Sequence, residues 1–198
     1  VRLCQKERRN RYCLRFSRQR KVVAVNIIIR NNKKPEQKLR RQVMDQIRLH
    51  LLEEVAGLHE IPAGAYNIRE NGKSIGRSST DEIEIVPKED GTGLDIFIKP
   101  GTKKKSVHIP VIISQSGLTE VVYNDFHIGE DADVTIIAGC GIHNGGDAAS
   151  RHDGIHRFFI EKNARVKYVE KHYGSGDGNG ERIMNPETEI EMAENSYM

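Results

Sequence analysis

The chain has 198 residues, of which 30% are charged and 37% are hydrophobic, and its formal net charge is +3. This length fits one domain with an appendage, and the absence of any apolar run of roughly 18–20 residues argues against a membrane-spanning helix. Only 3 cysteines are present, too few for a disulfide framework. Two of them, Cys4 and Cys13, have a spacing that matches no familiar metal pattern. We therefore expect a cytoplasmic protein that is not attached to a membrane.

The charge is divided unevenly along the chain. Residues 1–43 carry 15 Lys and Arg against 2 Asp and Glu, and residues 44–198 carry 16 against 26. A basic tail of this kind either binds nucleic acid or another anionic surface, or is a solvated extension outside the domain. We favour the second interpretation, because only Tyr12 and Phe16 could stack on bases. Residues 1–43 are thus expected to be a basic extension that is disordered or not part of the domain, and residues 44–198 are expected to form the domain.

An amphipathic helix is predicted near the start of the domain. Before it, Val22–Ile29 has the composition of a short strand, which Asn31–Pro35 would end. Over Met44–Leu58 the apolar residues recur at helical spacing, with charged residues on the other side. Gly57 and Pro62 are placed to end this helix. Since its polar face is mixed in charge, we expect the helix to pack on the domain rather than on a membrane.

Strands are predicted from Ile83 onward, because apolar and polar residues alternate in short runs separated by turns. Before them, Asn71-Gly72 is a strong turn signal, and Gly72-Lys73-Ser74 lacks the earlier glycine of a phosphate-binding loop. Pro110 should break one of the runs, because proline cannot donate to a sheet ladder. No helical pattern intervenes, so an all-β domain is predicted. The runs are Ile83–Ile85, Leu94–Ile98, Val107–Ile113, Val121–Phe126, Val134–Ala138, Ile155–Ile160 and Ala164–Val169.

A repeat of 32 residues organises the second half of the domain. The segment IGEDADVTI from Ile128 corresponds to IEKNARVKY from Ile160, and the same offset leads to Met192 in IEMAENSYM. Strand–turn–strand units at this period predict a β-solenoid, in which stacked coils bury an apolar face that one coil cannot bury alone. Since the last copy has no capping element after it, we expect the chain to be part of a longer solenoid.

Thiol and imidazole groups gather between the first two copies of the repeat. Cys140 and His143 are three residues apart, and His152 and His156 are four apart, so the second pair lies on one face of a strand. Thiolate and imidazole suit zinc or iron, and thiolate in particular suits iron–sulfur chemistry. The glycines beside Cys140 would let a ligand approach its sulfur closely. Cys140, His143, His152 and His156 are therefore the candidate metal ligands.

Other interpretations of these residues stay open. A cysteine in a strand is often a small buried apolar residue, and CxxH with HxxxH is not an established zinc spacing. A hydrolase could combine Cys140 with His152 or His156 and Asp153, but the sequence presents no oxyanion hole. The segment GSGDGNG from Gly174 is interpreted as a flexible loop, since it lacks the carboxylates of an EF-hand.

Four segments resemble the SufB/SufD family of iron–sulfur cluster assembly proteins, and most closely its short, permease-like branch. They are YNIRENGKSIGRSS, VHIPVIISQSGLTEVVYNDFHIGEDADVTIIAGCGIHN, SRHDGIH and ARVKYVEKHYGSGDGNGERIMNPET. The resemblance covers residues 44–198. It implies a right-handed parallel β-helix, which agrees with the repeat. It also implies a scaffold rather than an enzyme, on which a transient iron–sulfur cluster is built.

The resemblance also implies partners and site residues. Family members form a homo- or heterodimer, bind the ABC-type ATPase SufC, and take sulfur from a cysteine desulfurase or a sulfur carrier. Cys140 falls where SufB members have a sulfur-accepting cysteine in their LEGCT segment. His152 falls where they have the histidine of LHAAVV, whereas His143 and His156 match only the short branch.

The sequence departs from the family towards its C-terminus. The family's later coils carry a second cysteine and an acid–histidine group, and its C-terminal helices hold SufC; both come after the point that corresponds to Met198. Another hypothesis is therefore kept, a β-solenoid metalloprotein or metalloenzyme with a zinc or iron site at Cys140 and the histidines. Nucleic acid is not expected as a partner, although the basic residues 1–43 make that hypothesis testable.

Overall fold

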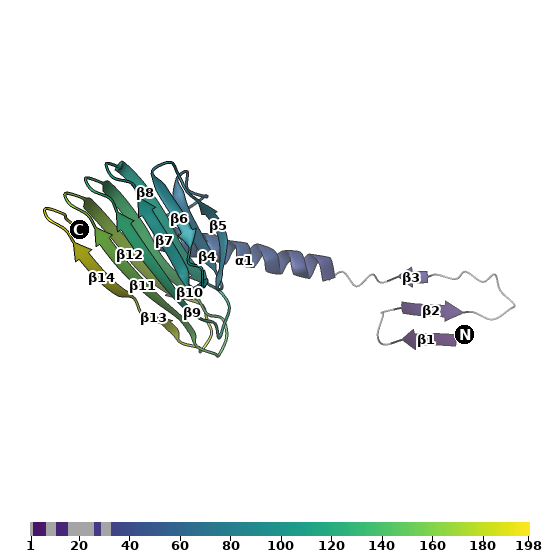
Figure 1. Cartoon of the computed structure of the whole chain (residues 1–198). Coiled ribbons are helices and arrows are strands. Elements are labelled where there is room, and N and C mark those ends of the chain that lie inside the picture. The colour runs from purple at the N-terminus through teal and green to yellow at the C-terminus, as the bar shows by residue number, and fades with distance from the viewer. Residues whose placement is uncertain (1, 7–10, 16–25, 29–32) are drawn as a thin grey trace. The chain divides into compact units, whose positions relative to one another are not determined.

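The computed structural model describes residues 2–6, 11–15, 26–28 and 33–198, with side chains from Arg41 onward. The chain divides into two compact units, Val1–Val43 and Met44–Met198, and Figure 1 shows the elements of both in chain order. Within the described residues, no helix is both long enough and apolar enough to cross a membrane.

The first unit contains a small antiparallel sheet. Its strands are β1 Arg2–Lys6, β2 Arg11–Arg15 and β3 Asn26–Ile28, paired in that order. From the sequence we expected disorder here, with one strand at Val22–Ile29. The backbones of these three segments pair in continuous register, and β3 lies within the predicted strand. The expected disorder of residues 1–43 stays a prediction. Residues 22–25 and 29 of the predicted strand lie outside the described residues, and so do the side chains of all three strands.

The helix α1 spans Lys33–Ala56. It therefore begins well before the predicted start at Met44. Pro35 had suggested a break in this region, but proline is compatible with the first turn of a helix, where N–H groups have no partner within the helix. The predicted apolar side of the helix is confirmed, since Leu51 and Val55 are fully buried.

The end of α1 is confirmed at the predicted glycine. Gly57 has φ +63° and donates its N–H to the carbonyl of Glu53, and Leu58 donates its N–H to the carbonyl of Leu52. These two bonds form a Schellman cap, which needs a residue in the left-handed region and so favours glycine. Leu52 and Leu58 pack in the same apolar cluster, as this cap usually requires.

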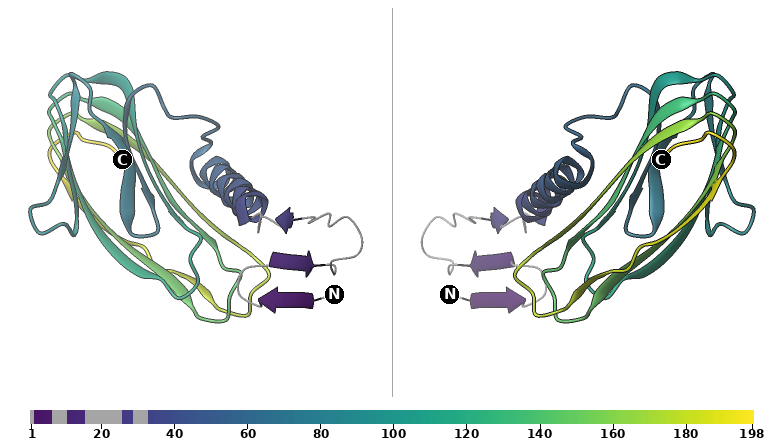
Figure 2. Two further views of the ribbon diagram at one scale, coloured as in Figure 1. Left: turned by 90° about the vertical axis from the view of Figure 1, so that its right-hand side faces the viewer. Right: turned by 90° about the vertical axis from the view of Figure 1, so that its left-hand side faces the viewer.

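The second unit is a solenoid of strands in two facing sheets, shown edge-on in Figure 2. Sheet B contains β4 Ala65–Glu70, β5 Lys73–Ser78, β8 Lys103–Ile113, β10 Asp133–His143 and β12 Arg165–Ser175. Sheet C contains β6 Ile83–Pro87, β7 Gly93–Ile98, β9 Thr119–Ile128, β11 Ser150–Ile160, β13 Arg182–Met184 and β14 Glu187–Met192. The strand orders are β12-β10-β8-β4-β5 and β13-β11-β9-β7-β6, and β14 also pairs with β11.

The predicted 32-residue repeat corresponds to one coil of the solenoid, because residues 32 apart pair in neighbouring strands. Strand β10 pairs with β12, and β9 with β11, in parallel, so that Val134 lies beside Val166 and Ile128 beside Ile160. The predicted β-solenoid is thus confirmed, with about three turns. The strands are longer than predicted, and β10 and β11 extend far enough to include Cys140 and His152.

Pro110 does not break β8, contrary to the prediction. It lies within an eleven-residue strand and pairs in register with Gly139 of β10. On the other side of β8, the register with β4 passes from His108 to Val111 without a pair at Pro110. The strand tolerates the missing N–H because the ladder with β4 is interrupted there.

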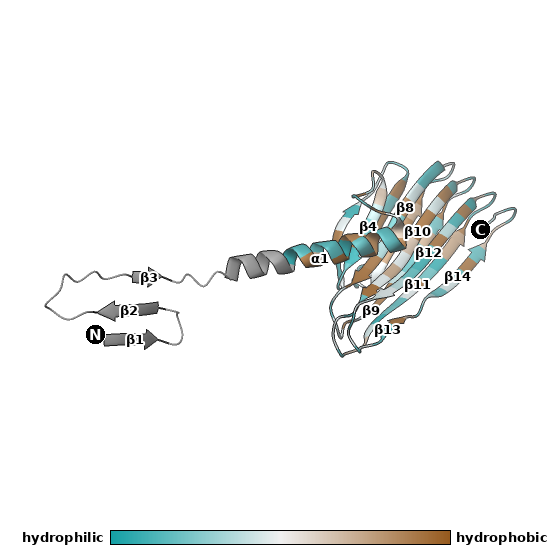
Figure 3. Cartoon of the chain, turned by 180° about the vertical axis from the view of Figure 1, so that it is seen from behind, coloured by the Kyte–Doolittle hydropathy of each residue, from teal (hydrophilic) through white to brown (hydrophobic). Residues whose placement is uncertain are grey.

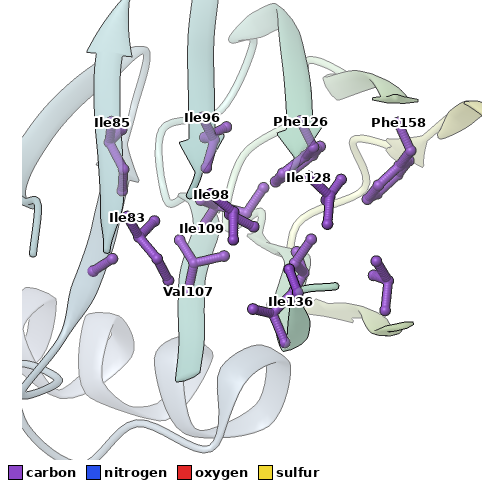
Figure 4. Packing of buried hydrophobic residues seen from close by; sticks show 14 of the residues in the cluster. Ile83, Ile85, Ile96, Ile98, Val107, Ile109, Phe126, Ile128, Ile136 and Phe158 are labelled. Carbon is purple, nitrogen blue, oxygen red and sulfur yellow. The ribbon is translucent and has the colours of Figure 1, made fainter. Parts of the chain in front are cut away.

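The main apolar core lies between the two sheets. Phe126 of β9 and Phe158 of β11 stack with their ring centroids 4.6 Å apart, and Figure 4 shows isoleucines from neighbouring strands packed in the same layer. Each coil adds its inward-facing residues to this layer, so stacking the coils removes their apolar area from water. The cluster also includes Ile83, Ile85, Leu94, Ile96, Ile98, Val107, Ile109, Ile128, Val134, Ile136, Ile160 and Val166.

The C-terminal part of α1 packs on the outer face of sheet B, as Figure 3 shows. A Cβ added to Gly139 would lie 2.9 Å from the Val55 carbonyl oxygen, and one added to Gly141 would lie 3.2 Å from Leu51. These glycines give room to the helix rather than to the sulfur of Cys140, because successive residues of a strand point to opposite sides. The prediction that they open a path to the sulfur is wrong.

Candidate functional site

One end of the solenoid interior is polar. On sheet B, the residues Arg69, Val111, Cys140 and His172 lie beside one another in register, from β4 through β8 and β10 to β12. Their side chains are on the inward side of the sheet, since Cys140 is fully buried while its glycine neighbours face α1. Cys140 therefore has Val111 in the preceding coil and His172 in the following coil as its neighbours.

Sheet C contributes two polar pairs to the same interior. Glu120 of β9 lies in register with His152 of β11, and Asn124 lies in register with His156. All four side chains are buried. Between the two histidines stands Gly154, which has no side chain, so the inward-facing imidazoles on either side can approach its backbone closely. The predicted common face of His152 and His156 is confirmed, and it is the inner face.

The thiol of Cys140 is enclosed. Its residue is 1% exposed and packs with Ile113 and Ile142. Burial raises the pKa of the Cys140 thiol far above its usual range, and the carboxylates of Glu120 and Glu170 add to the rise. The thiol is therefore protonated at neutral pH and is a weak nucleophile in this conformation. Any reactant has to reach the interior, and the proton has to be removed, before Cys140 can act as a nucleophile.

A buried ion pair lies at the start of the polar region. The Arg69 guanidinium donates to the Glu120 carboxylate from Nη2 at 2.6 Å and from Nε at 2.7 Å, and the two side chains are 15% and 5% exposed. Both contacts are made to Oε1, and Oε2 of Glu120 has no hydrogen-bond partner among the described residues. The pair neutralises its own charge while leaving one carboxylate oxygen free to accept a hydrogen bond or bind a cation.

His152 is a buried, uncharged histidine. Burial lowers its pKa to about 4, and the nearby His156 and Arg69 act in the same direction. Its Nδ1 has no hydrogen-bond partner among the described residues. At neutral pH the ring therefore keeps a lone pair on one nitrogen, which is the form that accepts a proton or binds a metal.

A carboxylate on β12 lies between two histidines. The Oε1 atom of Glu170 lies 3.6 Å from Nε2 of His156 and 3.5 Å from Nε2 of His172. Burial works to raise the pKa of Glu170, but the nearby His156 outweighs it, with smaller effects of Tyr168 and His172, and the net pKa is lowered. The carboxylate therefore stays ionised. Asn124 Nδ2 lies 3.4 Å from the remaining ring nitrogen of His156.

Unpartnered polar atoms gather in this interior. A Cβ added to Gly154 would lie 3.0 Å from Nε2 of His156 and 3.3 Å from Nε2 of His152, so both imidazoles border the space that the glycine leaves. Buried polar groups normally have a partner in protein, water or ligand, and leaving one without any costs about 1–3 kcal/mol. Those without a protein partner in the described part of the chain are Glu120 Oε2, Asn124 Oδ1, His152 Nδ1 and Tyr168 Oη.

Three of the four predicted ligands share this interior, and the fourth does not. Cys140, His152 and His156 point between the sheets. His143 lies on the outward side of β10, where its Nδ1 is 3.1 Å from the Ser175 hydroxyl, because it is separated from Cys140 by an odd number of residues. Among the described residues, no group of three or more His, Cys, Asp or Glu side chains is arranged to hold a metal ion.

The hydrolase arrangement considered from the sequence is also contradicted. Asp153 alternates with His152 along β11 and therefore points away from the interior. Its carboxylate accepts from Arg151 Nε at 2.9 Å on the outer face. Neither His152 nor His156 can be oriented by this aspartate in a triad with Cys140.

Sequence reasoning missed Arg69, Glu120, Asn124 and Glu170. The repeat contained a signal for two of them, since Glu120 and Asn124 precede His152 and His156 by 32 residues and so occupy the same inward positions one coil earlier. Arg69 lies in the antiparallel hairpin before the repeat, and Glu170 corresponds to Ala138. Their places in the site depend on the facing of the two sheets, which no spacing shows.

Comparison of the chain with protein-family models, with curated proteins and with solved structures found no match. The chemistry of the interior therefore has to be inferred from the residues themselves and their geometry.

Proposed function

We propose that this chain is a scaffold subunit for iron–sulfur cluster assembly of the SUF type, which accepts sulfur at Cys140 and holds a nascent cluster as cargo. In this proposal it works with a SufC-type ABC ATPase and with a second SufB/SufD-like subunit or a second copy of itself. A cysteine desulfurase or a sulfur carrier supplies the sulfur. The proposed partners rest only on the motifs that resemble the family. The proposed role of Cys140 rests also on its surroundings in the interior.

One observation supports the proposal most. A single thiol lies inside a solenoid among imidazole and carboxylate groups, several of which have atoms without a partner in the described protein. Persulfide, sulfide and ferrous iron are sensitive to oxygen, so a shielded interior with sulfur, nitrogen and oxygen donors suits them. A cysteine that served only to fill the core would not need His172 beside it and the carboxylates of Glu120 and Glu170 nearby.

The sulfur transfer has a simple balance. The Cys140 thiolate attacks the terminal sulfur of a donor persulfide, the donor's S–S bond breaks, and the donor leaves as a thiolate while Cys140 becomes a persulfide. No external oxidant or reductant is consumed. Because the thiol is buried and protonated in this conformation, the proton has to be removed as the donor approaches. His172, whose side chain is 31% exposed, lies beside Cys140 at the more accessible end of the polar row.

The iron step needs more ligands than the chain offers in this arrangement. Cys140, His152, His156 and Glu170 supply donor atoms of the right types, but they are not assembled around one point. The cluster is therefore treated as a transient cargo, and a stable cluster would need further ligands from a partner or from movement of these side chains. Anaerobic reconstitution with iron and sulfide is expected to give a weak, labile chromophore that depends on Cys140.

The decisive experiment is persulfide transfer. The chain is incubated anaerobically with a cysteine desulfurase and cysteine, and the sulfur is located by mass spectrometry of alkylated peptides. We expect one added sulfur atom on Cys140 and none at that peptide in Cys140→Ala. The double variant Cys4→Ala with Cys13→Ala is the matched control and should retain the modification. Labelling confined to Cys4 and Cys13 would contradict the proposal.

A metalloprotein is the competing candidate, because the imidazoles of His152 and His156 both border the space over Gly154. It is distinguished by elemental analysis after gel filtration. One tightly bound zinc or iron ion per chain, lost in His156→Ala, would favour the metalloprotein over the scaffold. The scaffold proposal expects no such stoichiometric ion in the chain as purified.

A further inference from the structure

The outer face of sheet C presents a column of stacked rings. Phe97 of β7, His127 of β9 and Phe159 of β11 lie in register. The ring centroids of Phe97 and His127 are 4.7 Å apart at an interplanar angle of 13°, and those of His127 and Phe159 are 5.0 Å apart at 11°. Phe97 is 41% exposed. The column borders a hollow of about 280 Å³ that Pro100 also lines.

A second apolar column lies four residues back along the same strands. Tyr123, which is 39% exposed, is in register with Ile155. Val121 extends this apolar area and is 43% exposed. Four residues of a strand correspond to roughly 13 Å, so the two columns are separated by the distance between residues i and i+4 of an extended chain.

The charges between the two columns neutralise one another. Lys88 donates to Asp95 at 2.6 Å and to Asp125 at 2.8 Å, and Arg157 donates to Asp125 from Nε and Nη2 at 2.8 and 2.7 Å. Such a network is satisfied internally and contributes little attraction for a charged partner. The surface in contact with a partner is therefore apolar along both columns and neutral between them.

The border of this face is acidic. Glu187, Glu189 and Glu191 alternate along β14, are exposed, and form no ion pair among the described residues. They follow Ile155, Arg157 and Phe159 in register. Glu187 and Glu189 line a hollow of about 390 Å³ together with Tyr123 and Ile155, so the acidic border and the second apolar column enclose one recess.

We propose that the outer face of sheet C binds a basic, apolar segment of another protein in an extended conformation. Its apolar side chains would lie on the columns of Phe97–His127–Phe159 and Tyr123–Ile155, and its Lys or Arg side chains would reach Glu187, Glu189 and Glu191. This face is the one that α1 leaves free, since the helix packs on sheet B. The inference does not depend on any reaction of Cys140.

The acidic border selects the class of partner. The three glutamates would repel nucleic acid and anionic membranes, because the phosphates and the carboxylates are both negative and both would lose hydration on contact. The same face of a second copy would bring two glutamate rows together and is disfavoured for the same reason. A cationic segment with aliphatic residues satisfies both the apolar columns and the glutamates.

The test uses the full chain and a fluorescently labelled lysine-rich peptide with leucine at every fourth position, titrated by fluorescence anisotropy. We expect saturable binding that weakens as salt is added. The double variant Glu189→Lys with Glu191→Lys should bind at least about tenfold more weakly. Glu53→Lys with Glu60→Lys, which changes net charge equally on exposed positions at the other face, should change affinity less than about twofold.

The apolar contribution is tested separately. Phe97→Ser with Phe159→Ser should weaken binding about fivefold or more without altering the salt dependence. Ile61→Ser with Ile75→Ser, at residues that are 67% and 48% exposed away from this face, is the matched control. A peptide with serine in place of leucine should bind the unmodified chain no more tightly than the leucine peptide binds the Phe97→Ser with Phe159→Ser variant. Absence of peptide binding, equal losses in the two charge variants, or an unaffected aromatic variant would each overturn the proposal.

Discussion

The interior of the solenoid has two halves that share the same strands and differ in chemistry. Near the carboxyl end of β9 and β11, Phe126 and Phe158 stack with an interplanar angle of 6° in an apolar core. Near the amino end of the same strands, the inward positions are Glu120, Asn124, His152 and His156. The register of 32 residues is continuous across both halves.

The two halves differ in how completely their buried groups are packed and paired, and this difference indicates which half stabilises the fold. The apolar half fills its space with large side chains that are fully buried. In the polar half, the imidazoles of His152 and His156 take up the room beside Gly154, and several buried polar atoms have no partner among the described residues. Proteins break the rule that buried polar groups are paired chiefly at functional sites, and there the loss of stability is offset elsewhere in the structure. We therefore expect substitutions in the two halves to behave differently.

The largest loss of stability should come from Phe158→Ala. This substitution removes a ring that is fully buried and stacked on Phe126, and it should lower the free energy of unfolding by about 3–5 kcal/mol. Urea denaturation followed by circular dichroism measures the change. Phe159→Ala, on the outer face of the same strand, is the control and should cost less than about 1.5 kcal/mol. Equal losses at the two positions would remove the contrast between core and surface.

A somewhat smaller loss is expected from Arg69→Leu, in the polar half. Removing the guanidinium leaves the buried Glu120 carboxylate without its partner, which should cost about 3 kcal/mol. The double variant Arg69→Leu with Glu120→Leu removes both charges and should recover most of that loss, as measured in a double-mutant cycle by urea denaturation. If the double variant were less stable than Arg69→Leu, the ion pair would not be the reason for the loss.

Acid should weaken the polar half first. The pKa of His152 is lowered to about 4 by burial, against about 6.5 in the unfolded chain. Below pH 6.5 the unfolded state therefore binds a proton that the folded state does not, and stability is lost as the pH falls towards 4, by at most about 3 kcal/mol.

The comparison variant for this pH dependence is His152→Gln. Unfolding free energies are measured from pH 7 down to pH 4 for both proteins, and the variant should show a shallower loss by about the amount assigned to His152. Burial also lowers the pKa of His108, but that residue is present in both proteins and cancels. Parallel curves would mean that His152 is charged in the folded state.

The smallest effect is expected from Cys140→Ala. The thiol fills little volume and has no hydrogen bond to lose, so the substitution should cost only about 1 kcal/mol. Thermal unfolding followed by circular dichroism measures this. A loss as large as that of Phe158→Ala would show that Cys140 is needed mainly for packing, and would weaken the case for a reactive role.

Much of the fold could be predicted from the sequence because its signals are local. Asn71-Gly72 forms the β4–β5 turn with φ values of 48° and 80°, as a hairpin turn with two left-handed residues requires. The alternation of apolar residues predicted where the strands lie, and the 32-residue repeat predicted which residues pair between neighbouring strands. The start of α1 was not predicted, because Pro35 is tolerated in a first helical turn, where N–H groups have no partner within the helix. The continuity of β8 through Pro110 was not predicted, because it depends on how the neighbouring strand β4 pairs there.

Less of the candidate site could be predicted. The sequence placed His152 and His156 on one face, which is correct. It also grouped His143 with Cys140, but residues three apart on a strand point to opposite faces of the sheet. It also assigned the glycines beside Cys140 to the sulfur, whereas Gly141 makes room for Leu51 of α1. In each case the choice of face depends on what packs against the strand.

The sequence by itself therefore determined the solenoid, its period and the chemical types of its interior groups, because alternation and repetition are properties of one chain read in order. The tertiary structure decided which of those groups meet. Arg69, Glu120 and Glu170 come from three different strands and lie near one thiol only because two sheets face each other across the interior. That facing also buries Cys140 and raises the pKa of its thiol, while Phe97 and Tyr123 on the outer face of sheet C stay exposed.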